Sequence, residues 1–64
     1  MTLLQLPMRK VDDCIRIENR LGHLIATTCG AIVTFYEPVT PDELRTVAWV
    51  SENYDLLILN LIEE

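Results

Sequence analysis

The hydrophobic residues in the C-terminal half of the chain recur at spacings of three and four. The positions that follow this spacing are Leu44, Val47, Val50, Tyr54, Leu57, Ile58, Leu61 and Ile62. This is the period of an α-helix that buries one face. At its start, Thr40 suits the N-cap, Pro41 suits the first helical position, and Glu43 can complete a capping box. The pattern therefore predicts a helix over residues 41–63.

The N-terminal half carries two signals that disagree. Residues 25–36 are rich in β-branched and aromatic types, which favour strands. At about 100° per residue, however, the apolar residues of this half fall within one arc of a helix. They are Val11, Cys14, Ile15, Ile17, Leu21, Leu24, Ile25, Ala26, Cys29, Ile32, Val33 and Phe35. Strict alternation holds only around residues 15–18, so the pattern favours one long helix over about residues 8–36.

A loop at residues 37–40 joins the two expected helices, and residues 1–7 form an apolar arm ahead of them. Helices joined by so short a loop lie antiparallel. The expected fold class is therefore all-α, a two-helix antiparallel hairpin in a single domain. The alternative takes Asn19–Gly22 and Cys29–Gly30 as turns of a small antiparallel β-sheet that is followed by one C-terminal helix.

The composition indicates that the hairpin pairs with a second copy of itself. The chain has only 64 residues, yet 50% of them are hydrophobic and 6% are aromatic. A chain this short cannot enclose so much aliphatic surface alone, so we expect a homodimer in which two hairpins form a four-helix bundle. The residues expected in the dimer core are Leu21, Ile25, Ile32, Phe35, Val47, Tyr54, Ile58 and Leu61. Such a dimer resembles, in layout, the hairpin dimers of plasmid copy-number regulators.

The charge and the cysteines narrow the environment in which the chain is expected to work. Ten acidic and five basic side chains give a net charge of −5, which disfavours general attraction to nucleic acid or to an anionic membrane. No apolar run approaches the roughly 18 residues needed to span a bilayer, and no secretory leader is evident. We therefore expect a cytoplasmic protein in which Cys14 and Cys29 are buried, reduced thiols.

No arrangement of residues in the sequence indicates catalysis. His23 is the only histidine, and it would lie on the opposite side of the first helix from Cys14, so the two could not form a thiolate–imidazolium pair. Asp12 and His23 would lie too far apart along the helix axis to share a metal ion. The chain is accordingly expected to be no enzyme and to hold neither cofactor nor metal.

One polar face of the second helix carries two large apolar residues. Trp49 and Leu56, with Glu52 and Asn53 around them, are typical of a helix-presented hot spot for another protein. The competing interpretation is that the arm at residues 1–7, or the dimer core, covers this face. The leading functional prediction is a non-enzymatic homodimeric module that binds a protein partner here.

A basic stripe on the first helix gives the alternative function. Its members are Arg9, Arg16, Arg20 and His23. Doubled across a dimer, the stripe could contact the phosphates of a nucleic acid. Asp12 and Asp13 stand four and three residues before Arg16, however, where they could neutralise it on a solvated face.

Two segments come nearest to a signature. They are Asn-Arg-Leu-Gly-His-Leu-Ile at residues 19–25 and Val-Thr-Pro-Asp-Glu-Leu at residues 39–44. In these segments, and in its length and acidity, the chain resembles the short early-region proteins of lambdoid phages. The resemblance implies a protein that binds and modulates a host or phage factor, and it assigns no role to any single residue.

Overall fold

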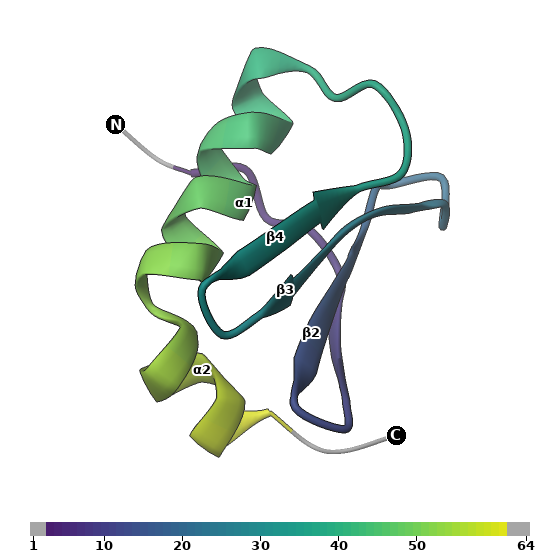
Figure 1. Cartoon of the computed structure of the whole chain (residues 1–64). Helices are drawn as coiled ribbons and strands as arrows, with labels where there is room; N and C mark the ends of the chain where they lie inside the picture. Colours follow the sequence, from purple (N-terminus) through teal and green to yellow (C-terminus); the bar gives the residue numbers. More distant parts are fainter. Residues whose placement is uncertain (1–2, 62–64) are drawn as a thin grey trace.

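The computed structural model describes residues 3–61 and contains a four-stranded antiparallel sheet followed by two helices. The elements are β1 (Met8–Val11), β2 (Cys14–Glu18), β3 (Leu24–Cys29), β4 (Ile32–Phe35), α1 (Pro41–Glu52) and α2 (Tyr54–Asn60). The strands lie side by side in sequence order, and both helices lie on one side of the sheet (Figure 1). The prediction of an all-α hairpin is therefore wrong.

Tight turns divide the region that was predicted to be one helix over residues 8–36. In the turn between β2 and β3, the side-chain Oδ1 of Asn19 accepts hydrogen bonds from the backbone N–H groups of Leu21 and His23, at 2.9 and 3.0 Å. Gly22 and Gly30 take positive φ values of 86° and 64°, which other residues rarely adopt. These two turns are those of the alternative prediction, an antiparallel sheet followed by one C-terminal helix. That alternative did not include the third turn, which Asp12 and Asp13 form between β1 and β2.

The core lies between the sheet and the helices. Ile15 and Ile17 of β2 are fully buried, and so are Ala26 and Thr28 of β3, which pair with them across the strands. Cross-strand partners point to the same face of a sheet. This side, which packs against the helices, is the helix-covered face; the opposite side is here called the open face.

The helical half begins as predicted but is interrupted once. The capping box is confirmed, because Thr40 Oγ1 accepts from the Glu43 N–H at 3.2 Å and Glu43 Oε1 accepts from the Thr40 N–H at 2.9 Å. At Asn53 the backbone leaves the helical region, and its side chain donates to the Trp49 carbonyl at 2.8 Å. The single helix predicted for residues 41–63 is therefore two helices, of which α1 packs against β3 and α2 against β2. Residues 62–63 of the prediction lie outside the described part of the chain.

The N-terminal arm packs along α1. The Leu4 carbonyl accepts a hydrogen bond from Thr46 Oγ1 at 2.8 Å, and Leu6 is buried in the core. Figure 1 shows the arm passing behind α1 before it enters β1. The described part of the arm, residues 3–7, therefore packs within a single copy and contributes Leu6 to its core.

The expected four-helix bundle has no counterpart in this fold, and its expected core residues are dispersed. Ile25 and Val47 are buried within one copy, and Tyr54, Ile58 and Leu61 are partly buried against the same core. Leu21 lies in a turn and is 80% exposed. Ile32 and Phe35 belong to β4, at the edge of the sheet. These eight residues therefore do not form one apolar seam.

The two cysteines form a disulfide, which corrects the expectation of reduced thiols. Because Ile15 pairs with Thr28, Cys14 and Cys29 stand opposite each other on neighbouring strands. Their Cα atoms are 4.3 Å apart. Both side chains are half-buried and lie on the same face as Arg16 and Thr27. The bond therefore joins β2 to β3 on the open face.

Candidate functional site

Strand β4 is an edge strand, paired with β3 on one side only. The N–H of Tyr36 donates to the carbonyl of Ile25 at 2.9 Å, so this residue turns its backbone groups inward. In an antiparallel ladder the inward and outward residues alternate. Val33 and Phe35 therefore direct their N–H and C=O groups toward the free edge.

Exposed apolar side chains flank this free edge on both faces. Ile32 is 68% exposed and lies on the open face, together with Tyr36. Phe35 is 45% exposed and lies on the helix-covered face, because its cross-strand partner is the buried Ala26. A strand added to β4 would thus gain main-chain hydrogen bonds and cover apolar surface above and below them.

The two edges of the sheet differ in how they are protected against pairing. Proline and charged side chains blunt an edge strand. Strand β1 has Pro7 directly before it and contains Arg9 and Lys10. The segment 31–36 around β4 contains neither a charged residue nor a proline. We therefore take the free edge of β4 as the candidate functional site.

The open face of the sheet brings together two of the four residues of the predicted basic stripe. Arg9 and Arg16 are exposed cross-strand partners, so they lie side by side on β1 and β2. Arg20 and His23 are exposed in the turn region after β2. An ion pair joins Arg9 Nη2 to Glu18 Oε1 at 3.8 Å. The separation is long for an ion pair and the Arg9 side chain is 55% exposed, so solvent screens the interaction and Arg9 keeps part of its attraction for an anion.

The aspartates expected to neutralise Arg16 lie elsewhere. Asp12 and Asp13 form the turn between β1 and β2. Within residues 3–61, neither aspartate forms an ion pair with Arg16. The helical spacing that suggested the pairing does not exist in a hairpin, and Arg16 is left to solvent.

The predicted protein-binding face on the helices is divided by the fold. Trp49 is 40% exposed, and it lines a small apolar cavity of about 110 Å³ between α1 and the arm. The other residues lining this cavity are Leu3, Leu4, Gln5, Leu6, Met8 and Thr46. Leu56 belongs to α2, beyond the break at Asn53, and is 66% exposed. The arm therefore covers part of Trp49, and a hot spot comprising Trp49, Leu56, Glu52 and Asn53 stays a prediction.

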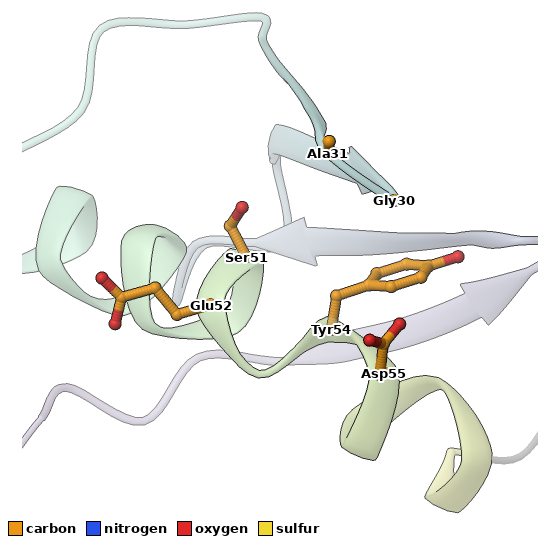
Figure 2. Close-up of a pocket in the computed structure, with 6 residues that line it drawn as sticks. All are labelled: Gly30, Ala31, Ser51, Glu52, Tyr54 and Asp55. Atoms are coloured by element: carbon orange, nitrogen blue, oxygen red, sulfur yellow. The ribbon is translucent and has the colours of Figure 1, made fainter.

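A second, more polar cavity of about 260 Å³ lies between the β3–β4 turn and the junction of α1 with α2. Gly30, Ala31, Ser51, Glu52, Tyr54 and Asp55 line it. Figure 2 shows the Glu52 carboxylate pointing away from Tyr54 and Asp55. The Tyr54 hydroxyl donates to the backbone carbonyl of Asp13. Since the two carboxylates diverge, they form neither a shared cation site nor an acid–base pair.

Comparison with known proteins adds no functional information. No family model, no curated protein and no solved structure matches the chain. Within residues 3–61, no helix is long and apolar enough to cross a membrane. In the same residues, no group of three or more His, Cys, Asp or Glu side chains could hold a metal ion. Any assignment of function must therefore come from the surfaces described above.

Proposed function

We propose that this chain is a small non-enzymatic interaction module that forms a homodimer by antiparallel pairing of β4 with β4 of a second copy. The observation that carries the proposal is the free edge of β4, which is uncharged and flanked by exposed apolar side chains. Two such edges joined around a two-fold axis would make one continuous sheet. The outward N–H and C=O groups of Val33 and Phe35 would then find partners in the other copy.

A second copy is the occupant that best fits this edge. A two-fold interface brings the same surface of both copies together, so a patch must be complementary to itself. Segment 31–36 meets this condition, since it carries no charge that would face its own copy. Glu37 is the first charged residue after β4. In an antiparallel pair the two copies of Glu37 lie at opposite ends of the interface, where they do not repel each other strongly.

The small size of the interface indicates how tightly the two copies should bind each other. Strand β4 has four residues. An interface built on one short strand falls at the small end of the range for specific interfaces, below about 1,200 Å². We therefore expect a reversible dimer that dissociates on dilution through the micromolar range.

A lysine on the β4 edge should prevent this dimer. Thr34 is exposed on the open face of β4, so the change Thr34→Lys places a charge in each copy where the two strands would meet. Like charges across paired strands are destabilising. Sedimentation velocity over a dilution series should show the wild type shifting from dimer to monomer and Thr34→Lys remaining a monomer.

The matched control is Ala48→Lys, which adds the same charge at an exposed position of α1. It should dimerise like the wild type. Circular dichroism of all three proteins checks that the fold is kept. A wild type that stays monomeric at millimolar concentration, or a Thr34→Lys variant that dimerises as tightly as the wild type, would overturn the proposal.

The identity of any further protein partner stays a prediction, and so does the proposed role as a phage-type modulator. The cytoplasmic location also stays a prediction. A reducing cytoplasm disfavours disulfides, so the Cys14–Cys29 bond would have to be unusually hard to reduce to persist there.

A further inference from the structure

The charges of the chain are divided between its two halves. Residues 8–36, which form the sheet, hold four basic and three acidic side chains. Residues 37–64 hold one basic and seven acidic side chains. The net charge of −5 is thus the sum of +1 for the sheet and −6 for the C-terminal half. An anion that approaches the open face is therefore repelled less than the net charge of the whole chain suggests.

A row of polar side chains crosses the open face. Arg9 pairs with Arg16, Arg16 with Thr27, and Thr27 with Thr34, so these four residues form one line across all four strands. We call this line the arginine row. Neighbouring strands are about 4.8 Å apart. The Arg9 and Arg16 side chains therefore start from neighbouring positions, from which both guanidinium groups can reach phosphates of one strand.

Tyr36 lies beside the arginine row on the same face. Its hydroxyl is 3.1 Å from Thr27 Oγ1, within hydrogen-bond distance, which ties the ring to the centre of the sheet. The side chain is 54% exposed. A half-exposed ring that is fixed at its far end can stack against a base without losing much further freedom.

We propose that the open face binds single-stranded nucleic acid, with phosphates on Arg9 and Arg16 and a base stacked on Tyr36. A single strand fits better than a duplex because an exposed sheet surface presents stacking side chains to unpaired bases. A duplex is read instead by an element that enters a groove. The proposal is independent of the β4 dimer, although pairing at β4 would join two arginine rows into one longer face.

The other charged residues around the open face limit its affinity for nucleic acid. Glu18 contacts Arg9 from the same face, and Asp12 and Asp13 occupy the turn at one end of β1 and β2. Arg20 lies in the turn at the other end, where it adds a positive charge. With so few phosphate contacts, binding should be weak at physiological salt and clear at low salt.

Fluorescence anisotropy of a labelled oligothymidine, at about 20 and 200 mM salt, tests the proposal with the full chain. The wild type should bind at the lower salt and lose most of its affinity at the higher. Arg16→Ala should weaken binding several-fold and reduce the salt slope by about one. Tyr36→Leu should weaken it by about 5- to 150-fold, because the stacking contact is lost.

Arg45→Ala is the matched control, since Arg45 lies on α1 and pairs with Asp42 there. It should bind like the wild type. No binding at low salt, equal losses for Arg16→Ala and Arg45→Ala, or binding only to duplex DNA or to vesicles of phosphatidylserine would each overturn the proposal. Thr34→Lys separates this proposal from the dimer, because it should block self-association while raising the affinity for the oligonucleotide by adding a positive charge to the arginine row.

Discussion

Replacing Ile17 with alanine should lower the free energy of unfolding by about 2–5 kcal/mol, the range for removing a large aliphatic side chain from a core. Ile17 of β2 is completely buried, between Met8 of β1 and Ala26 of β3. The surrounding strands cannot close over the space without moving. Because a chain of 64 residues has a total stability of only roughly 3–10 kcal/mol, this variant should be close to unfolded.

Leu21→Ala is the matched comparison for this prediction. Leu21 lies in the turn after β2 with 80% of its surface exposed, so its truncation should change stability by less than about 0.5 kcal/mol. Urea titration followed by circular dichroism measures both variants. In a helical hairpin Leu21 would be a core residue, so equal losses for Ile17→Ala and Leu21→Ala would contradict the sheet.

Reducing the disulfide should lower the free energy of unfolding by about 3 kcal/mol. Cys14 and Cys29 are separated by 15 positions in sequence, and closing a loop of that length in the unfolded chain corresponds to about this amount. The effect should appear as a shift of the urea midpoint to lower concentration when a phosphine reductant is added. Cys14→Ala/Cys29→Ala should unfold at the same midpoint as the reduced wild type.

The same double variant is the control for the reductant, since adding the reductant to it should change nothing. Thiol alkylation followed by mass spectrometry reports directly whether the cysteines are bonded. Oxidised and reduced wild type that unfold at the same urea concentration would show that the bond does not restrain the unfolded chain. Free thiols in protein purified without reductant would contradict the bond itself.

Local signals in the sequence were sufficient for the start of the helical half. Thr40, Pro41 and Glu43 define a helix N-terminus through side-chain and backbone groups only a few residues apart, and the structure has the capping box there. The predicted continuation of this helix to residue 63 missed the interruption at Asn53. Asn53 interrupts the helix while the apolar period continues through it, because α1 and α2 pack over different strands of the same sheet.

The helical prediction fails over residues 8–36 because the strands of the sheet are short. Only around Ile15 and Ile17 is alternation long enough to be recognised, and successive strands then bring further apolar residues at intervals that mimic a helical period. An irregularity of pairing opposite Ile17 and Glu18 adds to this, since it accompanies the burial of two successive residues, Ile25 and Ala26. The β-branched composition of residues 25–36 was the better guide.

The sequence does contain a feature that indicates the candidate site, but it has no such meaning if residues 8–36 form a helix. The run Ala-Ile-Val-Thr-Phe-Tyr at residues 31–36 is uncharged and rich in strand-forming types, which in a sheet marks an unprotected edge. That this run lies at an edge, and which of its backbone groups point outward, depends on the strand order. The proximity of Arg9 and Arg16 likewise depends on the register between β1 and β2.

Amide hydrogen exchange in β4, followed by NMR at several protein concentrations, tests the proposed pairing most directly. The Tyr36 amide bonds to Ile25 within one copy, and by alternation the Thr34 amide also points inward. Both should be protected at every concentration. The amides of Val33 and Phe35 should exchange quickly in dilute protein and become protected as the concentration rises. Fast exchange at Val33 and Phe35 that does not change with concentration would contradict the pairing of β4 with its copy.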